Sequence, residues 1–129
     1  MKNMLLKTAI EQRKMSYCPY SGYSVGAALL CADGSVYCGS NIENASFTPT
    51  VCAERVAFFK AISEGKREFS AIAIAGGKGG EITPSSPCGV CRQVMAEFCA
   101  PDFSVLIAQN AEEYKEYTLE QLLPLSFKL

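Results

Sequence analysis

The 129-residue sequence contains no histidine and no tryptophan. Histidine is the commonest metal ligand in proteins and the commonest general acid or base. Any metal site in this chain must therefore be built from cysteine, aspartate or glutamate. A side chain other than imidazole must also carry any proton that a catalytic reaction moves.

An excess of charge of one sign is missing as well, because 12 lysines and arginines face 13 aspartates and glutamates. Nucleic-acid binding needs a basic surface, so we expect no polynucleotide partner. No segment is long and apolar enough to span a bilayer, and residues 1–20 lack a secretory signal pattern. These absences predict a cytoplasmic protein with no membrane partner.

Seven cysteines are present, which is an odd number. In a reducing compartment they argue against a disulfide framework. The length predicts one domain over residues 1–129, with enough buried surface for a core without disulfides. A hydrophobic content of 49% is high for so small a domain and predicts that part of its surface packs against other copies of the chain.

Apolar periodicity predicts a chain that alternates helices and strands. The expected helices cover residues 2–15, 51–64 with Gly65 as the stop, and 87–98, where Pro87 opens the helix. The expected strands cover residues 25–32, 35–38, 71–75, 103–108 and 114–118, and Asp33-Gly34 joins the first two as a hairpin. Residues 41–50 and 76–86 are predicted loops, and a short helical tail follows Thr118. The alternation favours a layered α/β domain with a mixed sheet.

Two cysteine motifs have the spacing of metal ligands: Cys52-Ala53-Glu54, and Cys88-Gly89-Val90-Cys91 directly after Pro87. They supply three thiolates, which leaves a tetrahedral zinc one position short. An open position is typical of a catalytic site rather than a structural one. Glu54 lies two residues beyond the first ligand, where its carboxylate could move protons for a zinc-bound water.

Both motifs lie at predicted helix starts, and this position stabilises thiolates because helix N-termini carry partial positive charge. Three thiolates make a zinc cluster negative, which would make a bound water a poorer acid. Arg55 and Arg92 directly follow the two motifs. A guanidinium there could offset the charge by donating hydrogen bonds to thiolate sulfurs.

Other interpretations stay open on the motifs alone. Cys88 and Cys91 could be a redox pair, although this leaves Cys52 unexplained. Glu54 could simply complement the helix dipole. A closed structural site would need a fourth cysteine, but the remaining ones lack paired spacing and suit core positions better: Cys18, Cys31, Cys38 and Cys99. Because both motifs occur together, we favour an open catalytic zinc site.

These motifs, with several others, resemble the zinc-dependent cytidine deaminases, in the small homotetrameric class with three cysteine ligands. The resemblance covers nearly the whole chain. It includes Pro19-Tyr20-Ser21, Val25-Gly26-Ala27-Ala28, Asn41-Ile42-Glu43-Asn44-Ala45, Cys52-Ala53-Glu54-Arg55, Pro87-Cys88-Gly89-Val90-Cys91-Arg92-Gln93 and Leu122-Leu123-Pro124. It implies a three-layer α-β-α cytidine deaminase-like domain with a mixed central β-sheet.

The reaction implied by the resemblance is hydrolysis of cytidine and 2′-deoxycytidine to uridine and 2′-deoxyuridine plus ammonia, as in pyrimidine salvage. One Zn²⁺ per chain is held by Cys52, Cys88 and Cys91. A zinc-bound hydroxide attacks the amino-bearing ring carbon. Glu54 carries protons from the water to the ring nitrogen and to the leaving amino group, so it must reach both.

The resemblance also implies a set of substrate contacts. Asn41 and Glu43 bind the ribose hydroxyls, although on the residues alone a turn held by asparagine side chains is an equal explanation. The backbone of Ala53 and Ser86 binds the polar edge of the base. Tyr23 stands beside the pyrimidine where the family usually has phenylalanine, so its hydroxyl departs from the family pattern.

A homotetramer with sites shared between subunits is a further implication of the resemblance. Phe127 matches a tail aromatic that reaches a neighbouring subunit's site, and ordinary packing of the tail is an equal alternative. Phe47 stands where many relatives carry tyrosine, so a hydroxyl contact across the subunit interface is missing.

Rival functions make different predictions. Within the same fold, a deaminase of a cytosine-nucleoside antibiotic such as blasticidin S is the nearest rival, and Asn41 and Glu43 favour a ribose instead. A non-catalytic zinc module requires a fourth protein ligand, and a thiol oxidoreductase requires a disulfide between Cys88 and Cys91. The run Gly76-Gly77-Lys78-Gly79-Gly80 lacks the spacing of a phosphate loop, so the predicted substrate is a nucleoside rather than a nucleotide.

Overall fold

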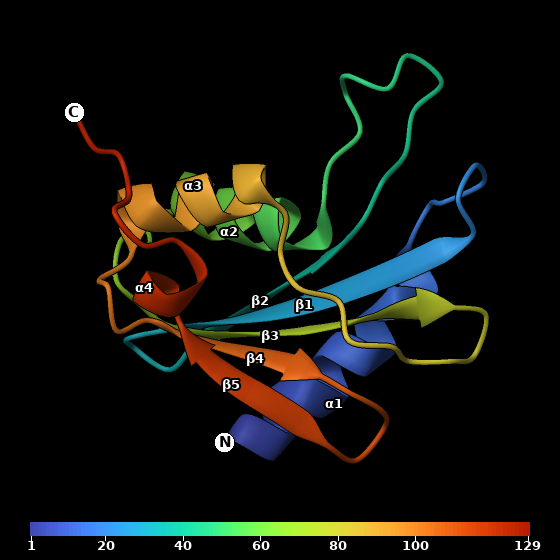
Figure 1. Ribbon diagram of the computed structural model, residues 1–129, viewed down its shortest axis with the longest axis horizontal. Coiled ribbons are helices and arrows are strands. Elements are labelled where there is room, and N and C mark those ends of the chain that lie inside the picture. Colours follow the sequence, from blue (N-terminus) through green and yellow to red (C-terminus); the bar gives the residue numbers. More distant parts are fainter.

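The computed structural model describes residues 1–129 and has a five-stranded sheet between helices (Figure 1). The helices are α1 (Lys2–Gln12), α2 (Ala53–Ser63), α3 (Gly89–Phe98) and α4 (Leu119–Leu122), and a 3-10 turn follows α1 at Arg13–Met15. The strands are β1 (Tyr23–Cys31), β2 (Val36–Ser40), β3 (Phe69–Lys78), β4 (Ser104–Ala108) and β5 (Tyr114–Thr118). None of the helices has the length and apolarity that a membrane span requires.

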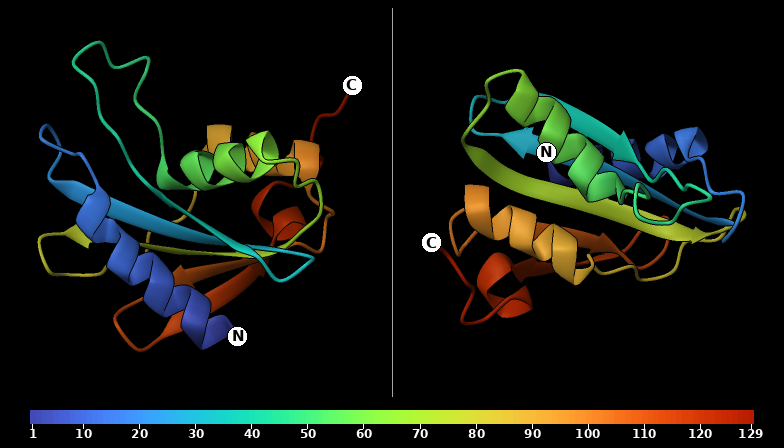
Figure 2. Two further views of the ribbon diagram at one scale, coloured as in Figure 1. Left: turned by 180° about the vertical axis from the view of Figure 1, so that it is seen from behind. Right: turned by 90° about the horizontal axis from the view of Figure 1, so that it is seen from above.

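The strands lie in the order β2–β1–β3–β4–β5, and only β3 and β4 run parallel. Helix α1 covers one face of the sheet, whereas α2 and α3 lie side by side on the other (Figure 1, Figure 2). This arrangement confirms the predicted three-layer α-β-α domain with a mixed central sheet. Because β3 and β4 are parallel, α3 forms the crossover between them.

Alternating residues on the central strands build a separate core on each face of the sheet. On the face covered by α2 and α3 the strands present large side chains, including Leu29, Ile72 and Ile74. On the face covered by α1 they present mainly small ones, such as Ala28 and Ala73. The small side chains let α1 lie close to the sheet, and the larger core supports the two helices that carry the cysteine motifs.

Strand β3 extends further than the apolar run 71–75 predicts, because β1 pairs with it over its whole length. Tyr23 pairs with Lys78 at the end of the ladder, so Gly76 and Gly77 belong to the strand. The prediction that these two glycines begin a loop is therefore wrong. The connection to α3 starts only after Lys78.

Cys52 and Cys88 are the N-cap residues of α2 and α3, one position before each helix. The prediction that Pro87 occupies the first helical position is wrong, since α3 begins at Gly89 and Pro87 precedes the cap. Neither cysteine side chain caps a backbone N–H. Both sulfurs are therefore left free for a metal, next to helix N-termini that favour thiolates.

The other helix ends lie close to their predicted positions. Helix α1 ends at Gln12, and the 3-10 turn covers the last three residues of the predicted helix 2–15. Helix α2 ends at Ser63, and Gly65 follows with a φ of 95°, as expected of a helix stop.

Helix α2 lies against β2 because Gly39 has no side chain. A Cβ atom at this position would lie 2.2 Å from the carbonyl oxygen of Ala53 and 2.7 Å from the backbone nitrogen of Ala57. Real Cβ atoms do not approach backbone this closely, so only glycine fits. The close approach holds the first turn of α2, which carries Glu54, against the sheet.

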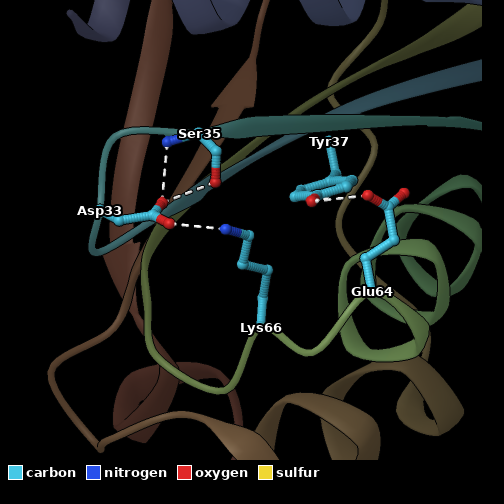
Figure 3. A network of polar contacts seen from close by, with 5 residues as sticks. All are labelled: Asp33, Ser35, Tyr37, Glu64 and Lys66. Atoms are coloured by element: carbon cyan, nitrogen blue, oxygen red, sulfur yellow. Dashed lines mark hydrogen bonds and ion pairs between the residues drawn. The ribbon is translucent and has the colours of Figure 1, made fainter.

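A network of exposed polar side chains connects the other end of α2 with the β1–β2 turn (Figure 3). The amine of Lys66 lies 2.7 Å from one oxygen of Asp33, whose other oxygen accepts a hydrogen bond from the Ser35 hydroxyl. The Tyr37 hydroxyl donates to Glu64 over 3.2 Å. Exposed ion pairs add little stability, so the network orients this end of the helix while the buried core supplies most of the stabilisation.

Candidate active site

The three cysteines of the two motifs converge at the N-termini of α2 and α3. The Cys88 sulfur lies 3.7 Å from the Cys52 sulfur and 3.6 Å from the Cys91 sulfur, and all three lie within 4.8 Å of one another. A tetrahedral zinc with Zn–S bonds of about 2.3 Å requires sulfurs about 3.8 Å apart. The predicted ligands therefore form a group of the size that zinc needs.

No other cysteine, aspartate or glutamate joins this group of ligand atoms, and none of the seven cysteines forms a disulfide. Of the remaining cysteines, Cys31 and Cys99 are buried, and Cys18 and Cys38 are half-buried. They take the packing role that their sequence context indicates. The geometry is that of an open three-ligand site rather than a closed four-cysteine one.

Arg55 lies where the sequence predicts it, with a guanidinium nitrogen 3.5 Å from the Cys52 sulfur. Hydrogen bonding with Cys91, aided by Arg55, lowers the pKa of the Cys52 thiol although burial opposes the shift. The shift favours the thiolate, which is the form that binds metal. The positive charge of Arg55 offsets part of the negative charge that three thiolates would place around a zinc.

Arg92 does not share this role, contrary to the expectation from its position after the second motif. Its guanidinium donates to the carbonyl oxygen of Pro87 over 2.7 Å and to that of Leu122 over 2.6 Å. These contacts join the segment before α3 to the end of α4. Arg92 therefore supports the position of Cys88 through the backbone, whereas Arg55 contacts the cysteine sulfur.

Glu54 lies in the first turn of α2 with only 4% of its surface exposed. Burial raises the pKa of its carboxyl group to about 7. A carboxyl group with such a pKa can both take up and release a proton near neutral pH. A glutamate that served only the helix dipole would gain nothing from burial, so its placement beside the cysteines favours a catalytic role.

A cavity of about 300 Å³ opens beside the cysteine cluster. Its lining includes eight of the predicted site residues: Tyr23, Asn41, Glu43, Cys52, Ala53, Glu54, Ser86 and Cys88. Residues to which the sequence analysis gave no role in the site complete the wall: Val25, Thr50, Val51, Ile74 and Ser85. One cavity thus contains both the reactive groups and the polar residues expected to bind a substrate.

Asn41 and Glu43 line this cavity while they hydrogen-bond the chain at the start of β1. Asn41 accepts from the N–H of Val25 and donates to the carbonyl oxygen of Tyr23, both over 2.8 Å. Glu43 accepts from the Ser21 hydroxyl over 2.5 Å. Amide and carboxylate oxygens each have two lone pairs, so both residues can bind a substrate hydroxyl while these contacts hold them in place. The turn interpretation and the ribose interpretation are therefore compatible.

Phe47 and Phe127 lie outside the cavity of their own chain. Phe47 is 75% exposed, with a φ of 65°, in the loop between β2 and α2 that projects from the molecule (Figure 1, Figure 2). Phe127 is 65% exposed in the C-terminal tail, where its carbonyl oxygen accepts a hydrogen bond from Gln93. Neither ring lines the site that the same chain forms.

Comparison with known proteins shows the family of the chain. Residues 1–107 match the family model of the cytidine and deoxycytidylate deaminase zinc-binding region. The chain belongs to this deaminase family. It is 50% identical over 126 residues to the cytidine deaminase of Halalkalibacterium halodurans, covering 98% of this chain and 93% of that protein. The crystal structure of cytidine deaminase from Burkholderia pseudomallei superposes with a TM-score of 0.90 at 40% identity, covering 98% of this chain and 99% of that chain.

Family membership confirms the predicted zinc-dependent hydrolase of the cytidine deaminase type and its three-cysteine zinc site. A protein with another substrate is similar too. The blasticidin-S deaminase of Bacillus cereus is 35% identical over 128 residues, covering 95% of this chain and 89% of that protein. The substrate of this deaminase must therefore be argued from its own cavity.

Proposed function

We propose that this deaminase hydrolyses cytidine and 2′-deoxycytidine to uridine and 2′-deoxyuridine with release of ammonia. The observation that carries the proposal is the shared cavity of Glu54, the cysteine cluster, Asn41 and Glu43. The cysteine cluster and Glu54 supply the groups that would react with the base. The amide of Asn41 and the carboxylate of Glu43 match the hydroxyls of an attached sugar. Similarity to the cytidine deaminase of H. halodurans supports the same substrate.

In the proposed reaction Cys52, Cys88 and Cys91 hold the zinc, which when bound supplies a Lewis acid that makes the attacking water more acidic. Glu54 accepts one proton from this water and passes it to the ring nitrogen beside the amino-bearing carbon. It then moves the second proton of the water to the amino group. The carbon–nitrogen bond breaks, the water oxygen stays on the ring, and ammonia leaves.

Other residues of the cavity are proposed to orient the nucleoside. Ala53 and Ser86 line the cavity, and their backbone groups are proposed to hydrogen-bond the polar edge of the base. The ring of Tyr23 supplies an aromatic surface beside the pyrimidine. Orientation matters because the reacting carbon must meet the water and the carboxylate of Glu54 together.

A nucleoside explains the cavity better than blasticidin S or a nucleotide does. Asn41 and Glu43 offer acceptors and a donor that match a sugar diol. The glycines that could suggest a phosphate loop do not form one, since Gly76 and Gly77 belong to β3. The cavity has no cluster of cationic side chains for a phosphate group.

The ultraviolet absorbance of cytidine incubated with the zinc-loaded protein tests the proposal. We expect conversion to uridine and release of one ammonia per cytidine. Turnover of blasticidin S with no turnover of cytidine would instead assign the antibiotic as the substrate. A protein that binds one zinc per chain and converts neither compound would be a non-catalytic zinc module.

We further propose that the protein forms a homotetramer in which subunits share sites. Large apolar side chains are exposed on the helical face and in the projecting segments, namely Phe47, Phe59, Val90 and Phe127. Exposed apolar surface of this kind is typical of subunit interfaces. Since Phe127 does not reach the cavity of its own chain, a neighbouring subunit is the place where it would line one.

The variant Phe127→Ala tests the shared site. We expect a roughly three- to tenfold rise in KM for cytidine with unchanged zinc content, because a ring that packs on the substrate contributes on the order of 1 kcal/mol. Steady-state kinetics and sedimentation velocity provide the measurement. Leu129→Ala, an exposed residue of the same tail, is the matched control. An unaltered KM for Phe127→Ala would indicate simple packing of the tail.

The cytoplasm is the proposed location, because seven cysteines without a disulfide suit a reducing compartment. We also propose that residues 1–129 act as one domain. The two hydrophobic cores lie on opposite faces of a single sheet and share its strands, so neither can form without the other.

A further inference from the structure

The hydroxyl group of Tyr23 has no task in the reaction described above, yet it is hydrogen-bonded twice. It lies 3.0 Å from the Thr83 hydroxyl and also bonds the Ser85 hydroxyl. Both partners belong to the loop between β3 and α3, which ends at the metal ligand Cys88. Tyr23 therefore connects the start of β1 with the segment that leads to the metal site.

The protons of this cluster have one consistent arrangement. The Ser85 hydroxyl donates to the carbonyl oxygen of Thr83 over 2.9 Å, so its oxygen accepts the proton of Tyr23. Because each hydroxyl has a single proton, the Thr83 hydroxyl then donates to Tyr23. The Tyr23 hydroxyl thus both donates and accepts, and its removal would leave both loop hydroxyls without their partner.

The cluster lies directly on β3. The N–H of Thr83 donates to the carbonyl oxygen of Gly76 over 2.8 Å, which brings the loop back onto the strand. A Cβ atom at Gly76 would lie 2.6 Å from the Ser85 hydroxyl oxygen and 3.1 Å from the ring of Tyr23. The missing side chain is what makes room for both residues. The loop is therefore fitted to the strand beneath it as well as to Tyr23.

We infer that the Tyr23 hydroxyl is a positioning group that holds the Thr83–Ser85 segment and thereby places the backbone of Ser86 at the cavity. In Figure 1 this loop runs from the end of β3 to the start of α3. Ser86 directly follows the tethered segment and lines the cavity with Ser85 and Cys88. The inference rests on the proposed function, in which the Ser86 backbone binds the base.

A tether of this kind acts on substrate binding more than on the chemical step. If the loop is ordered before the nucleoside arrives, binding does not have to order it. Loss of the tether should therefore raise KM and leave kcat nearly unchanged. A defect that disturbed Glu54 or the thiolates would instead lower kcat, so the two effects can be told apart.

Tyr23→Phe is the direct test, since it removes the hydroxyl and keeps the aromatic ring. We expect a roughly three- to tenfold rise in KM for cytidine with kcat within about twofold of wild type, the size expected for one or two lost hydrogen bonds. Ser85→Ala should give a similar rise. The double variant should rise little beyond the larger single effect, because both changes break the same contact.

The matched control is Tyr114→Phe, which deletes the hydroxyl of a half-buried tyrosine on β5, at the sheet edge beyond β4, away from the cavity. It should leave KM unchanged. Thr83→Val replaces the Thr83 hydroxyl, the other partner of Tyr23, by a methyl group of similar size. Like Tyr23→Phe, it should raise KM. Unchanged KM in Tyr23→Phe, or fully additive effects in the double variant with Ser85→Ala, would overturn the inference.

Hydrogen exchange gives a readout that does not depend on activity. In zinc-loaded Tyr23→Phe, the amides of residues 79–83, 85 and 86 should exchange roughly three- to tenfold faster than in wild type, while those of β4 stay protected. If wild type does not deaminate cytidine, the proposed function fails, and this measurement still decides whether the tether exists. Equal exchange rates of the loop amides in wild type and Tyr23→Phe would show that the tether does not exist.

Discussion

Replacing Glu54 by glutamine is expected to lower the turnover of cytidine by at least about a thousandfold while the fold and the zinc content stay unchanged. Glutamine has nearly the same size and fits a site where only 4% of the residue is exposed. It cannot accept the proton of the attacking water or deliver protons to the base. Zinc should remain, because the three sulfurs hold it without this carboxylate.

Three measurements on the same preparation decide the outcome: kcat from ultraviolet absorbance, zinc per chain from atomic absorption, and circular dichroism. Glu64→Gln is the matched control, since it changes a glutamate just beyond the other end of α2 whose side chain bonds only Tyr37. It should retain full turnover. Turnover of Glu54→Gln within tenfold of wild type would remove Glu54 from its role, and loss of zinc would show that the carboxylate helps to retain the metal.

The metal site could be predicted from the sequence because its geometry is mostly local. Cys88 and Cys91 are one helical turn apart, and Glu54 follows Cys52 by two residues, so each motif places its own groups. The spacing within each motif does not predict that the two motifs lie close together in the fold. That depends on α2 and α3 lying side by side on one face of the sheet, and the family resemblance provided it.

Features that depend on tertiary contacts were harder to foresee. Arg55 and Arg92 look equivalent in the sequence, yet Arg92 turns away from the thiolates because α4 offers it the carbonyl oxygen of Leu122. Val25 and Ile74 resemble ordinary strand residues, and only the pairing of β1 with β3 brings them to the cavity. Local signals cannot report such long-range neighbours.

The prediction of a loop at Gly76 and Gly77 is wrong for the same reason, because it ignores a long-range neighbour. Two consecutive glycines after an apolar run usually indicate a turn, so Gly76 was expected to begin a loop. In the structure β1 continues alongside, and its backbone satisfies the hydrogen bonds of β3 to the end. The missing side chain serves close packing rather than a turn, since Ser85 and Tyr23 occupy the space beside Gly76.

Removing one metal ligand with Cys88→Ala is the second change expected to have a large effect. We predict that zinc falls well below one per chain and that turnover drops by at least about a thousandfold, because the activated water is lost with the metal. Cys88 is the best ligand to remove, since it is exposed while Cys91 is buried in the core. Its loss should therefore leave the packing intact.

Cys38→Ala is the control for this variant, because it removes a half-buried cysteine on β2 outside the ligand group. Zinc content and turnover should match wild type. Full zinc occupancy in Cys88→Ala would contradict the three-sulfur assignment, since it would require a ligand other than the three cysteines. Zinc loss in Cys38→Ala would contradict it equally.

Thermal unfolding with and without a chelator extends this test. A ligand that binds only the folded chain raises its melting temperature, so chelation should lower the Tm of wild type and of Glu54→Gln. It should leave the Tm of Cys88→Ala unchanged, because that variant has little zinc to lose. The two variants then separate two tasks of the site: Glu54→Gln keeps the stabilisation by zinc without the chemistry, and Cys88→Ala loses both. A structural zinc module could not produce this pattern, because its glutamate variant would have no turnover to lose.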